Sequence, residues 1–210
     1  LQSGEVHCLV GENGAGKSTL MKILSGAERK NAGEIVIDGN PASIASPADA
    51  QQLGIGIIYQ DFKLVPSLSV AENILLGHEP LLGRSPFVDK KRMPEVSAGV
   101  IAQLGEQIDI ETPVESLSVA HRQIVEIAKV ITRKAHIIAM DEPSAPLTEN
   151  ELKKLFEVIR VLKKEGVGVI YISHRLEEIF EIGDRVTVLR DGKVIHSCSI
   201  TEADKRSLIK

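Results

Sequence analysis

The stretch that decides the fold reads Val10-Gly11-Glu12-Asn13-Gly14-Ala15-Gly16-Lys17-Ser18-Thr19-Leu20. An apolar run, residues 6–10, precedes it, and an amphipathic helical pattern with Leu20, Ile23 and Leu24 on one face follows it. A glycine-rich loop that ends in Gly-Lys-Ser between a strand and a helix is typical of phosphate-binding loops. The alternative is a glycine-rich turn that happens to precede Lys-Ser, but a chance match in a chain this long is on the order of 1%. The sequence therefore predicts a nucleoside triphosphate site.

Each part of this loop has a chemical reason. Glycines let the backbone turn tightly and bring its N–H groups up to an anion, and the helix that starts near Lys17 aims its positive dipole end at the same point. Lys17 adds a cation for the β- and γ-phosphates, and the Ser18 hydroxyl can ligate Mg²⁺. We predict nucleotide contacts from Gly11, Asn13, Gly14, Ala15, Gly16, Lys17, Ser18 and Thr19.

The composition is that of a globular, water-soluble protein with one substantial core. The chain has 210 residues, 43% hydrophobic and 26% charged, with a formal net charge of −4. This charge gives no reason to expect nucleic acid as a partner, and aromatics at 3% with no Trp argue against a stacking platform for single strands. No apolar run reaches the roughly 20 residues that a membrane-spanning helix needs. Because the chain begins at Leu1 without Met, we expect it to be a piece of a longer protein.

Apolar runs and helical patterns alternate along the chain. Residues 55–59, 136–140 and 167–172 are continuously apolar, which favours a covered, largely parallel sheet. A hairpin is predicted for residues 185–196 around Asp191-Gly192, and a turn for residues 38–41. Helix starts are expected at Ser46, at Ser118 and at the capping box formed by Thr148 and Glu151. Residues 61 to about 115 contain five prolines and short helical patterns, and we interpret them as a helical insertion.

Two carboxylates, Asp141 and Glu142, stand where the apolar run 137–140 ends. Ligands of open α/β sheets gather at the carboxyl ends of the strands. There Asp141 can reach a Mg²⁺ shell, and Glu142 can orient the attacking water and accept its proton. The alternative is a solvated acidic turn after a strand, but the phosphate-binding loop upstream favours the catalytic interpretation.

Gln60 and His174 also follow apolar runs. At a strand end the amide of Gln60 can contact Mg²⁺ or water, although a Gln there is usually only a polar exit. His174 can donate a hydrogen bond to the γ-phosphate, although a lone His is more often structural. Its place at a third strand end favours the functional interpretation. The stretch Leu117-Ser118-Val119-Ala120-His121 can aim helix N–H groups at a phosphate, but by itself it reads as an ordinary Ser-capped helix.

In this order, these elements resemble the nucleotide-binding domain of ABC transporters over essentially the whole chain. The resemblance identifies residues 11–19 as Walker A, Gln60 as the Q-loop, residues 117–121 as the signature, residues 137–141 as Walker B, Glu142 as the catalytic glutamate, residues 144–148 as the D-loop and His174 as the switch histidine. Residues 59–74, 125–129 and 171–175 are similar to the N-terminal half of two-cassette ATPases of ribose, galactose and xylose importers.

The resemblance implies an α/β fold: a P-loop NTPase (RecA-like) core with a mainly parallel sheet, a small antiparallel β part and a helical subdomain. We assign residues 1–210 to a single ABC ATPase domain, with the core at 1–60 and 134–210 and the helical subdomain at about 61–133. It also implies ATP and Mg²⁺, with Ser18, Gln60 and Asp141 as metal ligands and Glu142, His174 and Gln60 as catalytic residues.

The partners implied are a second ABC cassette, expected in the C-terminal half of the same polypeptide, transmembrane permease subunits and, indirectly, a periplasmic or lipid-anchored sugar-binding protein. No nucleic acid is expected. The predicted function is coupling of ATP hydrolysis to sugar uptake, at the cytoplasmic face of the bacterial inner membrane. The alternatives are a soluble ABC ATPase of DNA repair or translation, for which residues 61–115 are too short and insufficiently basic, and a cassette that binds ATP without hydrolysing it, against which intact Asp141, Glu142 and His174 argue.

Two departures from the family pattern matter. The signature is Leu-Ser-Gly-Gly-Gln in the family, whereas Val119, Ala120 and His121 replace its last three residues here. The added Cβ atoms are expected to crowd a γ-phosphate that approaches the helix start. In the family each ATP lies between the Walker motifs of one cassette and the signature of the other, so we expect one competent and one impaired site. Thr148 replaces the Asp of many D-loops.

Overall fold

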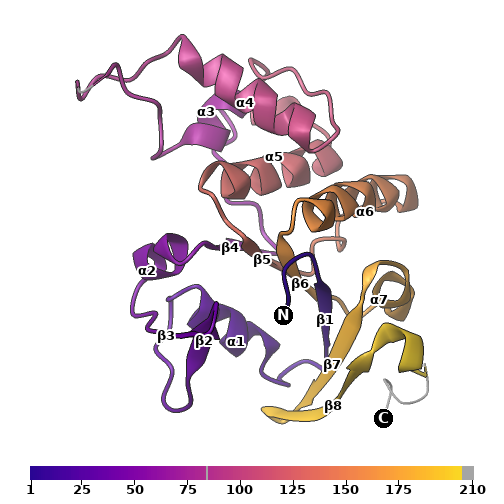
Figure 1. Ribbon diagram of the computed structural model, residues 1–210. Coiled ribbons are helices and arrows are strands. Elements are labelled where there is room, and N and C mark those ends of the chain that lie inside the picture. Colours follow the sequence, from indigo (N-terminus) through magenta and orange to yellow (C-terminus); the bar gives the residue numbers. More distant parts are fainter. Residues whose placement is uncertain (84, 205–210) are drawn as a thin grey trace. The chain divides into compact units, whose positions relative to one another are not determined.

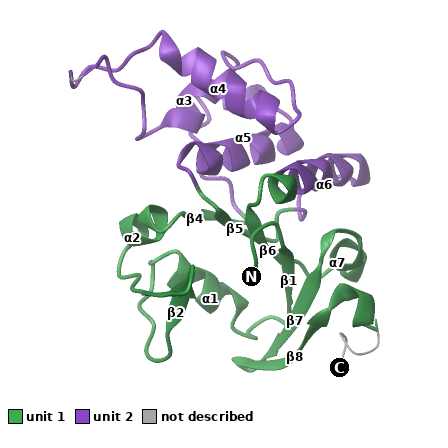
Figure 2. Ribbon diagram, in the orientation of Figure 1, with its two compact units in different colours: residues 1–60, 135–143, 162–210 green, residues 61–134, 144–161 purple. Residues whose placement is uncertain are grey.

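The computed structural model describes residues 1–83 and 85–204, which form two compact units (Figures 1 and 2). The first unit holds residues 1–60, 135–143 and 162–204, and the second holds 61–134 and 144–161. The sequence-based division placed residues 144–161 in the core, whereas they belong to the second unit. These residues form most of the helix α6 (Glu149–Lys164), which explains why they belong together. Hydrogen bonds from Thr148 and then from the backbone of Ala120, in the same unit, lower the pKa of Glu151 at its start.

The first unit is built on a six-stranded sheet. Its strands, in spatial order, are β4 (Ile55–Ile58), β5 (Ile137–Asp141), β6 (Gly168–Ile172), β1 (Val6–Val10), β7 (Arg185–Arg190) and β8 (Lys193–Ser199). All neighbouring pairs are parallel except β7 and β8, so the predicted largely parallel sheet and the hairpin are both confirmed. Because the five parallel strands share one direction, the loops after their carboxyl ends meet at one edge.

A second, two-stranded sheet was only half predicted. It pairs β2 (Ile35–Ile37) antiparallel with β3 (Asn40–Ala42). The predicted turn over residues 38–41 is wrong in its second half, because Asp38 and Gly39, with φ of 51° and 75°, make the whole turn. This two-residue Asp-Gly turn suits the twist of a hairpin, and Pro41 can follow it since an edge strand does not need every N–H group.

Short helices complete the first unit. They are α1 (Lys17–Leu24), α2 (Pro47–Gln52), α7 (Leu176–Ile182) and the 3₁₀ turn Ile200–Glu202. The predicted start of α2 is confirmed, because the hydroxyl of Ser46 accepts a hydrogen bond from the Asp49 N–H at 3.3 Å. Met21 of α1 packs with Leu9, Ala139 and Ile172 from three strands in one buried cluster. Burial of these side chains holds α1, and with it the phosphate-binding loop, against the sheet.

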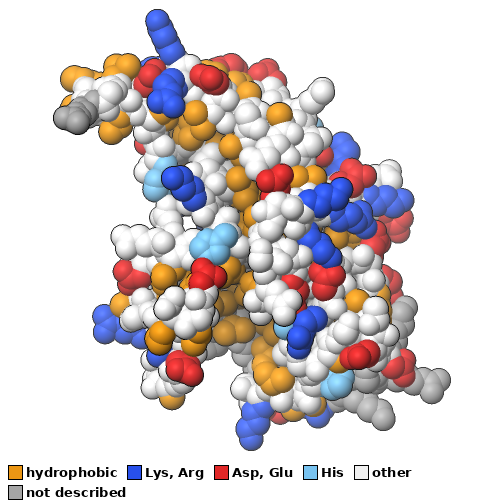
Figure 3. All heavy atoms as spheres, in the orientation of Figure 1, with side chains coloured by type: hydrophobic (Ala, Val, Ile, Leu, Met, Phe, Trp, Pro, Cys, Tyr) orange, Lys and Arg blue, Asp and Glu red, His pale blue; other side chains and the backbone are white. Residues whose placement is uncertain are grey.

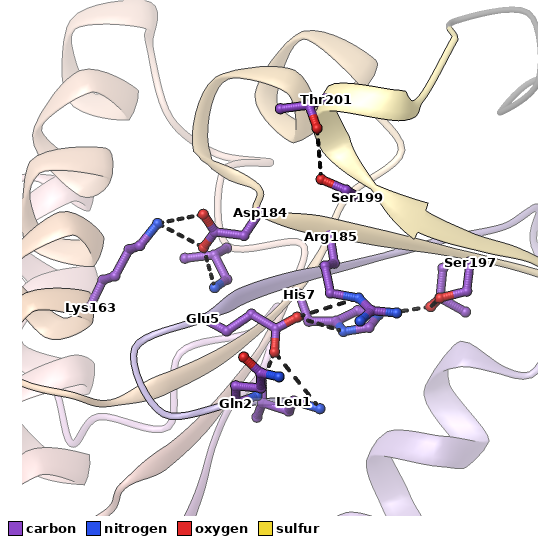
Figure 4. Close-up of polar contacts among 12 residues, drawn as sticks. Leu1, Gln2, Glu5, His7, Lys163, Asp184, Arg185, Ser197, Ser199 and Thr201 are labelled. Carbon is purple, nitrogen blue, oxygen red and sulfur yellow. Dashed lines mark hydrogen bonds and ion pairs between the residues drawn. The ribbon is translucent and has the colours of Figure 1, made fainter.

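Polar contacts at the amino end of β1 set its position in the sheet (Figure 4). The buried carboxylate of Glu5 lies 3.4 Å from Nδ1 of His7 and 3.7 Å from Nε of Arg185. Asp184 accepts a hydrogen bond from the Val6 N–H at 2.9 Å and pairs with Lys163 at the end of α6. Burial lowers the pKa of His7, and the Glu5 carboxylate opposes this effect. These contacts join β1 to β7 at the end of the strands opposite the phosphate-binding loop.

The second unit is helical, as predicted. Its elements are α3 (Val70–Leu75), α4 (Arg92–Gln103), the 3₁₀ turn Val114–Ser116, α5 (Val119–Thr132) and the first part of α6. Helices α3, α4 and α5 pack pairwise, and Ile74, Ile101 and Ile124 are buried among them. The capping box of α6 is confirmed, since the Thr148 N–H donates to Glu151 at 3.0 Å and the Glu151 N–H to the Thr148 hydroxyl at 3.4 Å. In the described part of the chain no helix is both long and apolar enough to cross a membrane.

Candidate active site

The loop between β1 and α1 needs glycine for two different reasons. Gly16, the N-cap of α1, has φ of 105°, a left-handed conformation that L side chains rarely adopt. At Gly11 the reason is space, because a Cβ there would lie 2.4 Å from the carbonyl oxygen of Leu189 on β7. The β7–β8 turn also supports the loop, since the Gly192 N–H donates to the carbonyl of Ala15 at 3.0 Å. The sheet thus fixes the shape of the loop.

Lys17 is held over this loop before any ligand arrives. Its side chain is 8% exposed, and Nζ donates to the carbonyl oxygens of Gly11 at 2.6 Å and Glu12 at 3.0 Å. The ammonium group is therefore positioned by backbone acceptors, which spares a ligand part of the entropic cost of ordering a long side chain.

Beside the loop lies an open cavity of about 350 Å³. It is lined by Asn13, Gly14, Gly16, Lys17, Ser18, Thr19, Gln60, Asp141 and Glu142. The fold thus brings together residues that follow β1 and β4 with residues at the end of β5, up to 129 positions apart in the sequence. Of the predicted loop residues, Gly11 and Ala15 do not line the cavity, and both support the loop instead, Gly11 by close approach and Ala15 through its carbonyl.

Asp141 and Glu142 place two acids at one wall of this cavity. Burial, and then the neighbouring Glu142 carboxylate, raises the pKa of Asp141, while Lys17 opposes the rise. Adjacent carboxylates with one cation nearby make a donor set that fits a hard divalent ion such as Mg²⁺. Glu142 has φ of 46°, unusual for a residue with a side chain, and its N–H donates to the carbonyl of Ile172 at 3.0 Å. Such strain costs roughly 1–3 kcal/mol and is found most often at functional sites.

His174 follows β6 and contacts Glu142 directly. Its Nδ1 lies 3.3 Å from Oε1 of Glu142, and the imidazole is 63% exposed while the Glu142 side chain is 22% exposed. The exposed ring leaves Nε2 available to a ligand, and the contact can hold the carboxylate of Glu142 in one orientation. The prediction that Glu142 and His174 meet at one edge of the sheet is confirmed.

Sequence reasoning missed the residue that anchors the loop of His174. Glu178, 2% exposed, accepts hydrogen bonds from the hydroxyls of Tyr171 at 2.9 Å and Ser173 at 2.7 Å. Ser173 in turn accepts from the Arg175 N–H at 3.0 Å, so both neighbours of His174 are held. The only signal in the sequence was an acidic residue in the first turn of a short helix. A carboxylate at such a position is ordinarily expected to face solvent.

The predicted signature residues belong to the second unit. Ser118 caps α5, and its hydroxyl accepts from the His121 N–H at 3.2 Å, which confirms the predicted helix start. Ala120 is 5% exposed, so its methyl group faces the interior of the unit, whereas Val119 is partly exposed. Of the two Cβ atoms expected to crowd an approaching phosphate, Val119 carries the one that remains accessible.

Comparisons with known proteins identify the family of this chain. Residues 1–145 match the family model described as ABC transporter. The ribose import ATP-binding protein RbsA 1 of Rubrobacter xylanophilus is 52% identical over 210 residues, which are 100% of this chain and 42% of that protein. RbsA of Lacticaseibacillus paracasei is 49% identical over 210 residues, again 42% of its length. The chain therefore spans about two fifths of the length of these curated relatives.

A solved structure gives the same result at the level of the fold. The protein cbiO1 from Clostridium perfringens, described as part of the ABC transporter complex cbiONQ, superimposes with a TM-score of 0.82 at 25% identity, over 99% of this chain and 82% of that one. With its phosphate-binding loop, the acids after β5 and the histidine after β6 in the family's order, this chain belongs to the ABC transporter family.

Proposed function

We propose that this chain is an ATP-binding and ATP-hydrolysing cassette that couples hydrolysis to uptake of a sugar across a bacterial membrane. The observation that carries the proposal is the single cavity lined by Lys17, Ser18, Gln60, Asp141 and Glu142. The sugar follows from the relatives, because proteins that match the whole chain are named as import ATP-binding proteins for ribose or for ribose, galactose and methyl galactoside.

The residues divide the chemistry among them. Lys17 and the loop N–H groups bind the β- and γ-phosphates. Ser18, Asp141 and Gln60 hold Mg²⁺, which when bound neutralises charge on the phosphate oxygens. Glu142 accepts the proton of the attacking water. His174 orients Glu142 across their 3.3 Å contact and donates a hydrogen bond to the γ-phosphate.

Three kinds of partner belong to this proposal: a second cassette, permease subunits and a sugar-binding protein. We infer a second cassette in the same polypeptide, since the relatives are more than twice as long as this chain. We also infer permease subunits that bind the described apolar surface of residues 60–82, and a sugar-binding protein that delivers the substrate to them. Val65, Leu81 and Leu82 are exposed in that region. In Figure 3 apolar side chains gather at the upper left of the face, where Figure 1 shows the chain between α3 and α4. Together these partners place the cassette on the cytoplasmic side of the membrane.

We further propose that the two ATP sites of the full protein are unequal. The Walker motifs here would be completed by the partner's signature, and the signature of this chain, with Val119 at its start, would serve the other site. Equal hydrolysis rates at the two sites, measured with each catalytic glutamate replaced in turn, would contradict this asymmetry.

The test of the function separates binding from turnover. Glu142→Gln keeps the shape and removes the base, so ATP binding persists and phosphate release falls by about a hundredfold or more. Lys17→Ala removes the cation, so ATP affinity falls. Affinity is measured by calorimetry on this chain, and phosphate release in the natural full-length polypeptide with its permease. Glu165→Gln, an exposed acid outside the cavity, is the matched control. Wild-type turnover in Glu142→Gln, or undiminished affinity in Lys17→Ala, would contradict the assigned roles.

A further inference from the structure

The chain segment just after Gln60 is attached to α5 by a pair of opposed contacts. The backbone N–H of Lys63 donates to the carboxylate of Glu126, and the backbone carbonyl of the same residue accepts from Nζ of Lys129 at 3.3 Å. Glu126 and Lys129 are three positions apart on α5, so both side chains project from one face of the helix. The donor and the acceptor groups of a single residue are therefore both held by α5.

Asn73 on α3 completes the attachment. Its side chain is fully buried, its oxygen accepts from the Val65 N–H at 2.7 Å, and its amide nitrogen donates to the carbonyls of Val65 at 3.0 Å, Leu68 at 3.1 Å and Ser69 at 3.1 Å. We call residues 63–69 the anchored segment. Backbone groups of Lys63, Val65, Leu68 and Ser69 are thus hydrogen-bonded to side chains of α3 and α5, which both belong to the second unit.

Burial of the Glu126 carboxylate is unfavourable by itself, which indicates that its contact with Lys63 is functional. The residue is 7% exposed, and burial raises its pKa, although the Lys63 N–H, Lys129 and Arg133 oppose the rise. A buried acid is unfavourable unless it is hydrogen-bonded and paired. An apolar residue on this face of α5 would avoid that cost and would leave the Lys63 N–H without this acceptor.

The position of the anchored segment gives the attachment its consequence. The first segment of the first unit ends at Gln60, a cavity residue, and the second unit begins at Asp61. Only Asp61 and Phe62 separate Gln60 from the anchored segment. The helix α5, to which the segment is attached, has the signature residue Ser118 as its N-cap.

We propose that Glu126 and Lys129 are positioning residues that attach the backbone of Lys63 to α5, so that a displacement of Gln60 by nucleotide is passed to the second unit. The proposal rests on the proposed function, in which Gln60 contacts the nucleotide site. Without these two contacts, residues 61–64 would absorb the displacement before it reaches Val65, which Asn73 holds.

The experiment measures the distance between the two units with spin labels. Arg29→Cys in the first unit and Gln103→Cys in the second provide exposed labelling sites, in a Cys198→Ser background. Cys8 stays, because its thiol is fully buried and burial raises its pKa to about 12. Pulsed electron paramagnetic resonance spectra are recorded with and without MgAMP-PNP, a non-hydrolysable ATP analogue. Its affinity is measured in parallel by calorimetry. The parent chain is expected to show a shift in the interspin distance on binding.

Glu126→Ala is expected to lose this shift without losing affinity for MgAMP-PNP. Glu126→Gln, whose amide oxygen can still accept from Lys63, keeps the shift, and Lys129→Ala loses part of it. Glu157→Ala, an exposed acid of α6 in the same unit, is the matched control and keeps the full shift. Circular dichroism establishes that each variant is folded, and if Glu126→Ala is unfolded, Lys129→Ala carries the test.

Two results overturn the proposal and are distinct from failure of the proposed function. One is a full shift in both Glu126→Ala and Lys129→Ala, and the other is a parent chain that binds MgAMP-PNP with no shift. A parent chain that does not bind MgAMP-PNP refutes the proposed function itself, and this inference falls with it.

Discussion

Replacing Glu178 by Ala is expected to destabilise the chain far more than its place on a short surface helix suggests. Its Oε2 accepts hydrogen bonds from the hydroxyls of Tyr171 and Ser173, and its Oε1 lies 3.4 Å from Nη1 of Arg175. Tyr171 is 0% exposed and Ser173 is 2% exposed. Because water does not reach these hydroxyls, neither can replace the lost carboxylate with solvent.

The magnitude follows from the two buried hydrogen bonds that Tyr171 and Ser173 lose. Each hydrogen bond to a charged group contributes about 1.5–3 kcal/mol, and removal of a buried acid returns part of its desolvation cost. The expected loss is therefore about 3–4 kcal/mol in the free energy of unfolding, and at roughly 2–4 °C per kcal/mol for a chain of this size the Tm falls by about 10 °C. Turnover also falls, because Ser173 and Arg175 flank His174.

Glu177→Ala is the matched control, since it removes the same charge from the same first turn of α7 at an exposed position. It is expected to change stability by about 0.5 kcal/mol or less. Urea denaturation followed by circular dichroism measures both variants against the parent chain. If Glu178→Ala is no more destabilising than Glu177→Ala, the assignment of Glu178 as the anchor of the His174 loop is refuted.

Three further predictions concern the first unit and the helix α4. Gly11→Ala forces a Cβ to 2.4 Å from a carbonyl oxygen of β7, so ATP affinity measured by calorimetry should fall by about tenfold or more, whereas Gly99→Ala, which meets open space in α4, should leave it unchanged. Burial and then nearby carboxylates raise the pKa of Cys8 to about 12, so iodoacetamide at pH 8 should label Cys198 first by mass spectrometry, and equal labelling of native Cys8 would contradict this. Burial lowers the pKa of His7 below 6.5, so the unfolded chain binds the proton more readily than the folded chain. The free energy of unfolding should therefore decrease as the pH drops through about 6.5, and this decrease should be smaller in His7→Gln.

Much of the site was predictable because strand direction and strand ends are visible in the sequence. Apolar runs at 55–59, 136–140 and 167–172 predicted parallel strands, and the polar residues after them had to meet at one edge. The cavity that holds Lys17, Gln60, Asp141 and Glu142 confirms that these side chains meet. Their catalytic roles stay predictions until variants are measured.

Other features escaped sequence reasoning because they depend on distant backbone. Pro41 was placed in a turn because proline usually breaks strands, but the edge position of β3 tolerates it. Gly11 was assigned to the phosphate approach, whereas the carbonyl of Leu189, far along the chain, is what excludes a side chain there. The boundaries of the two units likewise depend on which helices pack together.

By itself the sequence determined the family, the strands that carry the site and the chemical type of each site residue, because loop composition and apolar runs are local properties. Only the tertiary structure decided which groups support them. Nothing in the sequence marks these supporting residues, which are Glu178 for the loop of His174, Gly192 for Ala15, and Glu126 and Lys129 for Lys63. Their roles arise because a buried donor or acceptor must find its partner in space, and packing alone brings that partner within reach.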